Sequence, residues 1–217
     1  MSEQAPMTLP RIYPILDTQA LAAKACDAET AASAWLDAGA RILQFRHKGP
    51  WTRGVFGEAA QVSERCRERD ASFVVNDRAD MAKLLAAGLH VGQDDLPPGD
   101  ARTLLGSGAF IGFSTHNPDQ LETARVEAVD YLAIGPVFAT ASKHKPDPVL
   151  GLETLARCRA RCHRPLVAIG GITRETARAV FACGVDSIAV IGDLIPENCT
   201  AANLRRRMEE WQQLAQK

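Results

Sequence analysis

Short aliphatic runs recur along the chain, and longer segments between them carry apolar residues three and four positions apart. The short runs have the length and β-branched content of buried strands, whereas the longer segments have the period of amphipathic helices. We predict strands at residues 12–16, 42–45, 73–75, 89–91, 110–113, 131–134, 166–169 and 188–191. We predict helices at residues 28–38, 55–69, 79–87, 101–105, 118–127, 152–161, 174–183 and 202–214.

Strand and helix alternate from one end of the chain to the other. This order is typical of right-handed βαβ units that build a parallel sheet, and eight repeats suit a closed barrel better than an open sheet. The length of 217 residues matches the size of such barrels. We therefore predict an α/β protein with a single (β/α)₈ TIM-barrel domain over residues 1–217, in which residues 1–10 form a flexible N-terminus.

Individual residues mark several predicted helix boundaries. Asn117 is placed to cap the helix that Pro118 begins, and Thr173 is placed to cap the helix at 174–183. The three glycines at positions 39, 88 and 184 stand where we expect helices to end.

Composition and charge exclude several classes of protein. Hydrophobic residues make up 46% of the chain but aromatic residues only 6%, which favours aliphatic strands covered by alanine-rich helices. The formal net charge of −1 creates no overall field that would attract nucleic acid or an anionic membrane. Residues 1–10 lack a basic region followed by an apolar run, and no apolar stretch approaches a membrane span of about 18 residues. We therefore expect a cytoplasmic protein with small-molecule substrates and neither nucleic acid nor membrane as a partner. A homo-oligomer is an open alternative to a monomer.

The six cysteines are scattered along a chain that is large enough to fold without disulfides, and they form no CxxC pair. Cys158, Cys162 and His163 have the spacing of a metal site. No second ligand pair accompanies them, so a helix with small apolar residues four apart is the preferred interpretation.

Polar side chains follow the second, third and fourth predicted strands, where a barrel builds its active site. Gln44, Arg46 and Lys48 alternate in an extended segment, so they point to the same side. Asp77 and Asp95 follow the next two strands, and carboxylates beside basic residues suggest a hydrated Mg²⁺ carried by a diphosphate. The alternatives are solvated surface charges for the basic residues and an N-cap role for Asp77.

The later strands end in residues suited to binding anions. Residues 114–116 read Ser-Thr-His, but adjacent residues on one segment rarely form a hydrolase triad, and no Gly-x-Ser-x-Gly turn is present. The connection at 135–148 carries hydroxyls and lysines that could close over an anionic substrate; the alternative is a solvated insertion. Gly170, Gly171 and Gly192 follow the last two strands, where barrels often bind phosphate through backbone N–H groups, although a glycine pair can also be a simple tight turn.

With these motifs in place, the chain resembles the thiamine phosphate synthase family from about Arg11 to Leu194. The matching motifs are Gln-x-Arg-x-Lys at 44–48, Asn-Asp-Arg at 76–78, His-x-Gly-Gln-x-Asp at 90–95, Ser-Thr-His at 114–116, a Gly-Pro-Val-Phe loop at 135–143 and Ala-Ile-Gly-Gly-Ile at 168–172. The chain departs from the family at Thr140 and Ser142, where a Thr-x-Thr pair is usual, and at 192–194, where Gly-Asp-Leu replaces Ser-Ala-Ile.

The resemblance implies an enzyme that joins hydroxymethylpyrimidine diphosphate to thiazole phosphate, giving thiamine phosphate and pyrophosphate. It implies that the pyrimidine diphosphate is bound by Gln44, Arg46, Lys48 and Asn76, and Mg²⁺ by Asp77 and Asp95. Ser114 and Lys143 would lie beside the leaving group, so that the catalytic residues are Arg46, Lys48, Ser114 and Lys143. The thiazole phosphate would be held by Thr140, Ser142, Gly171, Ile191 and Gly192. We expect the Asp193 side chain to turn away from that phosphate.

Two other functions are compatible with much of this pattern. A thiazole tautomerase, a barrel relative, would use His116 as an acid–base group and would need no second magnesium ligand, so Asp95 favours the synthase. A non-catalytic barrel that binds a phosphate ligand is the second alternative, because Asp193 places a negative charge near the expected phosphate site.

Overall fold

The computed structural model describes residues 9–140 and 147–216, and over these residues eight parallel strands close into a barrel in sequence order. The strands are β1 (Ile12–Asp17), β2 (Ile42–Arg46), β3 (Ser72–Asn76), β4 (Gly88–Val91), β5 (Ile111–Thr115), β6 (Tyr131–Ile134), β7 (Leu166–Ile169) and β8 (Ser187–Val190). The last pairing, between β8 and β1, closes the sheet. The predicted (β/α)₈ barrel is therefore confirmed.

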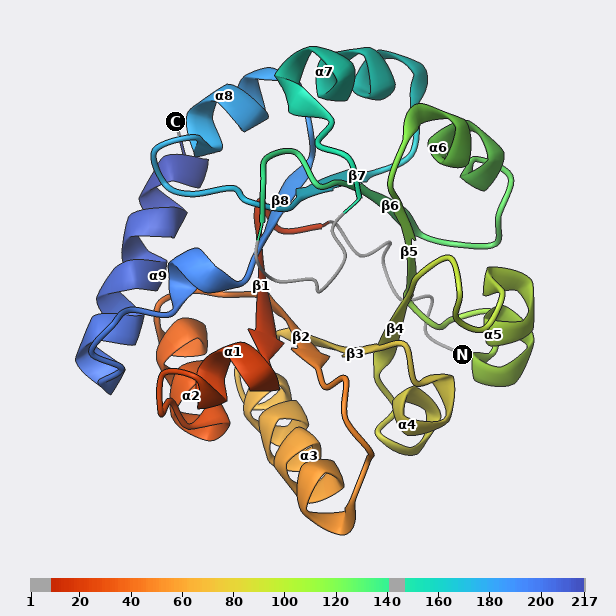
Figure 1. Cartoon of the computed structure of the whole chain (residues 1–217). Coiled ribbons are helices and arrows are strands. Elements are labelled where there is room, and N and C mark those ends of the chain that lie inside the picture. Colours follow the sequence, from red (N-terminus) through yellow and green to blue (C-terminus); the bar gives the residue numbers. More distant parts are fainter. Residues whose placement is uncertain (1–8, 141–146, 217) are drawn as a thin grey trace.

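Helices surround this barrel on the outside (Figure 1). They are α1 (Thr18–Ala22), α2 (Ala28–Asp37), α3 (Arg53–Arg67), α4 (Ala79–Leu84), α5 (Pro98–Leu105), α6 (Pro118–Ala124), α7 (Gly151–Arg161), α8 (Ala177–Ala182) and α9 (Ala201–Ala215), with a short 3₁₀ turn η1 (Gly192–Leu194) after β8. The sequence did not predict α1 or η1, because each is too short to show a helical period. No described helix is long and apolar enough to cross a membrane.

Two of the predicted helix boundaries were wrong. Thr173 does not cap α8: the helix begins later, after Thr176, and the Thr173 carbonyl accepts from the N–H of Ala177 at 2.9 Å. Gly88 does not end a helix but begins β4. A Cβ at this glycine would stand 2.9 Å from the carbonyl oxygen of Phe110, so its role is the close approach of two strands.

The other boundary residues behave as expected. The Asn117 side chain accepts from the N–H of Gln120 at 2.8 Å, and Pro118 begins α6. Gly39 and Gly184 follow α2 and α8 with φ of +94° and +84°, the left-handed conformation common after helix ends.

The core has two layers. The larger lies between the strands and the helices, and the smaller fills the inside of the barrel. Both faces of the strands are therefore buried, as is usual for parallel sheets covered by helices. The interior cluster comprises Leu9, Tyr13, Ile15, Ile42, Val74, Tyr131, Ala133, Val167 and Ala189. Leu9 is only 8% exposed, although it belongs to the segment expected to be flexible; residues 1–8 lie outside the described residues.

A disulfide joins Cys26, between α1 and α2, to Cys199, just before α9. The sequence did not predict it, because the two cysteines are 173 positions apart and lie in no recognisable pair motif. Of the other cysteines, Cys66, Cys158 and Cys162 are buried, and Cys158 and Cys162 pack in the outer core layer.

The inside of the barrel has room for Tyr131 only because position 112 is glycine. A Cβ at Gly112 would lie 2.0 Å from the Tyr131 ring, so we expect Gly112→Ala to lower the free energy of unfolding by about 1–3 kcal/mol through overpacking. Denaturant unfolding measures this change. Gly99→Ala is the control, because a Cβ at that position in α5 meets no atom within 4 Å. Equal stability of the two variants would contradict the prediction.

Candidate active site

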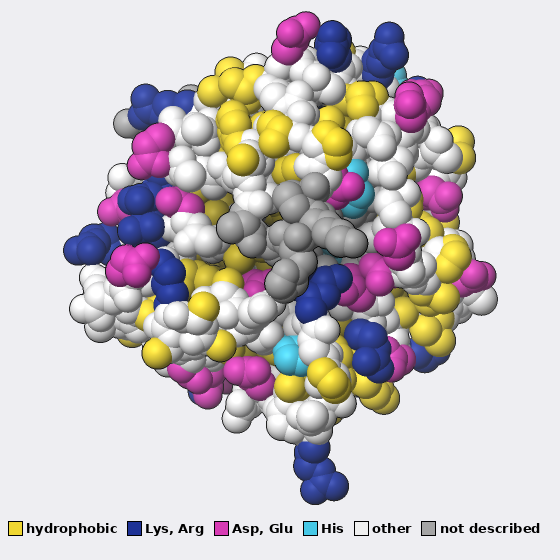
Figure 2. All heavy atoms as spheres, viewed as in Figure 1, with side chains coloured by type: hydrophobic (Ala, Val, Ile, Leu, Met, Phe, Trp, Pro, Cys, Tyr) yellow, Lys and Arg dark blue, Asp and Glu magenta, His cyan; other side chains and the backbone are white. Residues whose placement is uncertain are grey.

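The carboxyl ends of the strands surround a cavity of about 440 Å³, and all eight strands contribute to its lining. Figure 2 shows that basic and acidic side chains lie next to one another beside the centre of this face. The lining includes every predicted site residue that the structure describes, namely Gln44, Arg46, Lys48, Asn76, Asp77, Asp95, Ser114, Thr140, Gly171, Ile191 and Gly192. Ser142 and Lys143 lie outside the described residues.

The three polar residues at the end of β2 line the cavity together, and each has a different protein partner. Gln44 Nε2 donates to the Tyr13 hydroxyl at 3.2 Å. Arg46 forms an ion pair with Asp17, and Lys48 Nζ lies 2.6 Å from Asp77 Oδ2. The Arg46 side chain is only 14% exposed, so it is not a solvated surface charge, whereas Lys48 is half exposed at the mouth of the cavity.

Asp17 does not line the cavity but holds Arg46, and the sequence analysis missed it. Its carboxylate is buried, accepts from the N–H of Ala20 at 2.8 Å as the cap of α1, and also pairs with Arg46. A mostly buried guanidinium that is bonded to a buried carboxylate has a fixed direction, because leaving either charge alone would be costly. The signal was available: Asp17 follows the aliphatic run of β1, as Arg46 follows that of β2.

Asn76, at the end of β3, has an unused donor. The residue is 6% exposed, and its side-chain nitrogen Nδ2 is buried without a hydrogen-bond partner among the described residues. Because a buried amide without an acceptor is costly, an unpaired donor that lines a cavity indicates a place where a ligand accepts a hydrogen bond.

Asp77 and Asp95 form an acid pair beside Lys48. Burial raises the pKa of the Asp77 carboxyl, the hydrogen bond from Lys48 lowers it, and the hydrogen bond with Asp95 raises it, for a net upward shift. Asp95 Oδ2 also accepts from the N–H of Gly92 at 2.7 Å. Asp77 has a φ of +64°, which is strained for a residue other than glycine. It makes no cap bond to α4, so the N-cap alternative is wrong.

This pair has the chemistry of a cation site. Two neighbouring carboxylates repel each other, and a divalent cation between them removes the repulsion. No group of three or more histidine, cysteine, aspartate or glutamate side chains in the described parts of the chain could form a complete metal cage. Mg²⁺ commonly uses one or two carboxylates and takes its other ligands from water and phosphate. The pair therefore fits an ion that arrives with a phosphorylated ligand.

A chain of buried hydrogen bonds runs across the barrel at the floor of the cavity. The hydroxyl groups of Tyr13 and Tyr131 are 2.9 Å apart, Tyr131 bonds to His90 Nδ1 at 2.9 Å, and His90 Nε2 lies 2.8 Å from Ser114 Oγ. With the bond from Gln44 to Tyr13, the chain links the ends of β2 and β5. Burial raises the pKa of Tyr13 to about 12 and that of Tyr131 well above its ordinary value, so both phenols stay neutral.

The glycines after β7 serve a close approach between two loops. A Cβ at Gly171, where φ is +65°, would lie 2.3 Å from the carbonyl oxygen of Ala139, and one at Gly170 would lie 2.5 Å from Pro136. Gly192 is different, because a Cβ there would meet no atom within 4 Å. The backbone hydrogen bonds among the described residues include none from the N–H of Gly171 or Gly192, and both residues line the cavity.

Two further polar residues lie at the rim of the cavity. The Asp193 carboxylate accepts hydrogen bonds from Arg174, in the loop after β7, and from Trp211, in α9. His116 Nδ1 donates to the carbonyl of Gly135 at 3.0 Å and lies 3.5 Å from a carboxylate oxygen of Asp147.

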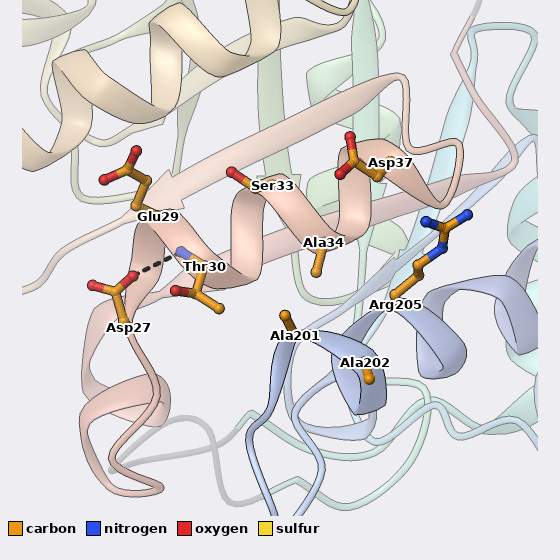
Figure 3. Close-up of a pocket in the computed structure, with 9 residues that line it drawn as sticks. All are labelled: Asp27, Glu29, Thr30, Ser33, Ala34, Asp37, Ala201, Ala202 and Arg205. Carbon is orange, nitrogen blue, oxygen red and sulfur yellow. Dashed lines mark hydrogen bonds between the residues drawn. The ribbon is translucent and has the colours of Figure 1, made fainter.

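A second cavity of about 420 Å³ lies between α2 and α9, away from these groups (Figure 3). Its acidic residues already have structural partners: Asp27 caps α2, Glu29 pairs with Arg65, and Asp37 pairs with Arg69. The cavity at the carboxyl ends of the strands is therefore the candidate active site.

Comparison with known proteins agrees with the geometry. The family model described as thiamine monophosphate synthase matches residues 12–194. A thiamine-phosphate synthase of Koribacter versatilis is 45% identical over 87% of this chain and 90% of its own length. Another, from Laribacter hongkongensis, is 45% identical over 76% of each chain. The solved thiamine phosphate pyrophosphorylase of Pyrococcus furiosus superposes with a TM-score of 0.82 at 31% identity, over 95% of both chains.

The contacts of Asp77 predict opposite effects of two substitutions on its pKa. Asp95→Asn should lower the pKa of Asp77, because a neighbouring negative charge is removed, and Lys48→Met should raise it, because a cation is removed. Carboxyl ¹³C shifts of Asp77, followed by NMR over a pH titration without added metal, report both changes. Shifts of the same sign in the two variants would show that the acid pair is not coupled as described.

Proposed function

Because this chain belongs to the thiamine monophosphate synthase family, we propose that it joins hydroxymethylpyrimidine diphosphate to thiazole phosphate, with release of pyrophosphate. The observation that carries the proposal is that the basic residues of β2, the acid pair and the glycine loops line one cavity. Neither the tautomerase nor the non-catalytic alternative gains support from the similar proteins described above. We also propose a cytoplasmic location, in keeping with an enzyme of thiamine biosynthesis.

The pyrimidine diphosphate would occupy the side of the cavity formed by β2 and β3. Arg46 and Lys48 supply positive charge for the diphosphate, while the amide groups of Gln44 and Asn76 supply directional hydrogen bonds. The unpaired Nδ2 of Asn76 supports this assignment, since a substrate acceptor would satisfy it. Lys48 can exchange Asp77 for phosphate more easily than Arg46 can leave Asp17, because Lys48 is half exposed.

Asp77 and Asp95 would hold Mg²⁺ at this end of the diphosphate. The bound ion would neutralise charge on the diphosphate oxygens and so favour their departure as pyrophosphate. Lys48 lies beside the pair and adds a second positive charge there.

In the reaction, the bond between the pyrimidine methylene carbon and the diphosphate oxygen breaks, and pyrophosphate leaves with the electron pair. The pyrimidine amino group stabilises the resulting cation, and the thiazole nitrogen donates its lone pair to form the new C–N bond. Arg46 and Lys48 stabilise the charge that develops on the leaving group, and no covalent nucleophile is needed.

Ser114 Oγ would donate a hydrogen bond to the leaving group, while His90 Nε2 holds the hydroxyl in place. Lys143 is assigned beside the same group, and Ser142 to the thiazole phosphate, both from the family resemblance alone. The rest of the thiazole phosphate site would comprise Thr140, the backbone at Gly171, and the segment Ile191 to Gly192.

Product formation should depend on a divalent metal and on Asp77. We expect excess chelator to abolish thiamine phosphate formation by the purified protein, and Asp77→Asn to lower turnover at least about a hundredfold, since a main electrostatic contribution to catalysis is removed. Asp94→Asn is the matched control, because Asp94 is the exposed neighbour of Asp95. Pyrophosphate release and thiamine phosphate are measured together. Full activity in chelator, or in Asp77→Asn, would refute the role of the acid pair.

The two glycine positions should respond differently to an added side chain. Gly171→Ala forces a Cβ against the Ala139 carbonyl at a positive φ, so it should raise the KM for thiazole phosphate by about tenfold or more. The side chain added by Gly192→Ser would meet no atom within 4 Å at its Cβ and brings one hydroxyl. It should therefore change the binding free energy of thiazole phosphate by about 1 kcal/mol at most. Steady-state kinetics with each substrate varied in turn make the comparison. Equal effects at the two positions would argue against a phosphate site between these loops.

A further inference from the structure

Three segments of the chain meet at the side chain of Asp193. They are the loop after β7, which contains Gly171 and Arg174, the turn η1, and the outer helix α9. Asp193 Oδ2 accepts from Arg174 Nε at 3.0 Å and from the indole Nε1 of Trp211 at 2.9 Å. The Asp193 backbone carbonyl accepts from Arg207 Nη1 at 2.7 Å.

These contacts neutralise the Asp193 charge within the protein. Arg174 and Arg207 face both Asp193 and Glu210, so two cations are matched by two carboxylates. The Asp193 side chain is only 14% exposed, and its bonds are charge-assisted or donated by a fully buried tryptophan. A carboxylate held in this way adds little repulsion for a phosphate bound in the neighbouring cavity.

The turn that carries Gly192 is held through its backbone and its neighbours. Gly192 has no side chain to pack, a Cβ there would meet no atom within 4 Å, and its carbonyl accepts from the N–H of Ile195 at 3.1 Å. Its neighbour Asp193 is bonded both to α9 and to Arg174, which follows Gly171 by three positions. The position of one glycine loop is thereby tied to that of the other.

We propose that Asp193 is a positioning residue that holds the loops of Gly171 and Gly192 at the spacing required to bind the phosphate of the thiazole substrate. This inference rests on the proposed function, because it assigns the phosphate to these loops. Asp193 acts through the backbone of the loops and does not touch the substrate.

The first test separates the two substrates. Asp193→Ala should raise the KM for thiazole phosphate about tenfold, equivalent to the loss of one hydrogen bond, and leave kcat and the KM for the pyrimidine diphosphate within twofold of the wild type. Asp193→Asn keeps one oxygen acceptor but no charge. Its KM for thiazole phosphate should therefore lie between those of the wild type and Asp193→Ala. Glu210→Gln is the matched control: it faces the same two arginines but lies on α9, outside both loops, and should change neither KM by more than twofold.

The second test asks whether Asp193 acts through Arg174. If it does, the KM of the double variant Asp193→Asn, Arg174→Gln should not exceed that of the weaker-binding single variant by more than twofold. Additive effects would show that the two residues act separately and would overturn the proposed link between the loops. Both substitutions are at partly exposed side chains, and unfolding curves confirm that each variant is folded before kinetics are compared.

The third test does not depend on turnover. Among the described residues, Trp211 donates a hydrogen bond from its indole, whereas Trp35 Nε1 and Trp51 Nε1 have no acceptor. Its ¹⁵N–¹H indole signal, assigned with Trp211→Phe, should shift when thiazole phosphate or inorganic phosphate is added to the wild type, and not in Asp193→Ala at the same concentrations. The tenfold change in KM should also appear in the dissociation constant of thiazole phosphate, measured for the wild type and Asp193→Ala by isothermal titration calorimetry.

The outcomes separate the positioning role from the proposed function. Absence of thiamine phosphate formation by a wild-type protein whose Trp211 signal responds to phosphate would overturn the proposed function and leave the positioning role intact. Unchanged or tighter binding of thiazole phosphate by folded Asp193→Ala would overturn the positioning role, and tighter binding would show that the carboxylate repels the ligand.

Discussion

A closed barrel has to fill its own interior, and the polar atoms placed there have to find partners inside it. In this protein two tyrosines meet that requirement: Tyr13 and Tyr131 fill space in the lower part of the cavity and bond to each other across the barrel. Gly112 leaves room for the ring of Tyr131. Because Gln44 and His90 complete the hydrogen bonding of these phenols, the filling of the interior also fixes the direction of groups at the cavity floor.

The charges of the site are arranged in two ways that suit different tasks. Arg46 is mostly buried and bonded to a buried carboxylate, so its position is determined by the protein. Lys48 is half exposed and paired with Asp77. Burial and the neighbouring Asp95 raise the pKa of the Asp77 carboxyl. A ligand that brings phosphate and a cation can therefore rearrange the second pair at lower cost than the first. The site combines a fixed guanidinium with an ammonium group that can change partner.

Much of this site could be predicted from the sequence, because the carboxyl ends of parallel strands meet at one face. Recognising the strands was enough to bring Gln44, Arg46 and Lys48 together with Asp77 and Asp95. Asp17 was missed because a single acidic residue after a strand has the same pattern as the N-cap of the next helix, a role that it also has. The tyrosines were missed for another reason: an inward tyrosine within a strand has the same pattern as any core residue.

Other features depend on three-dimensional proximity, which no local pattern contains. Arg174, Asp193 and Trp211 belong to three different segments, and their meeting depends on how α9 packs beside α2, β1 and η1. The predicted cap at Thr173 was wrong because a hydroxyl residue before a helical pattern marks the helix start only to within a few residues. The N-cap position of α8 is Thr176. The sequence also does not show whether a side chain would fit at a glycine position. A Cβ at Gly171 would collide with the carbonyl of Ala139, whereas a Cβ at Gly192 would meet no atom within 4 Å.

The bond between Cys26 and Cys199 makes most of the barrel part of one covalent ring. Strands β2 to β8 lie between the two cysteines, while β1 and α9 lie on the chain outside them. β1 nevertheless pairs with both β2 and β8, so the strand that closes the sheet is supplied from outside the ring. A protease that cuts once in any loop from β2 to β8 would therefore leave two pieces still joined through sulfur, and only reduction would separate them.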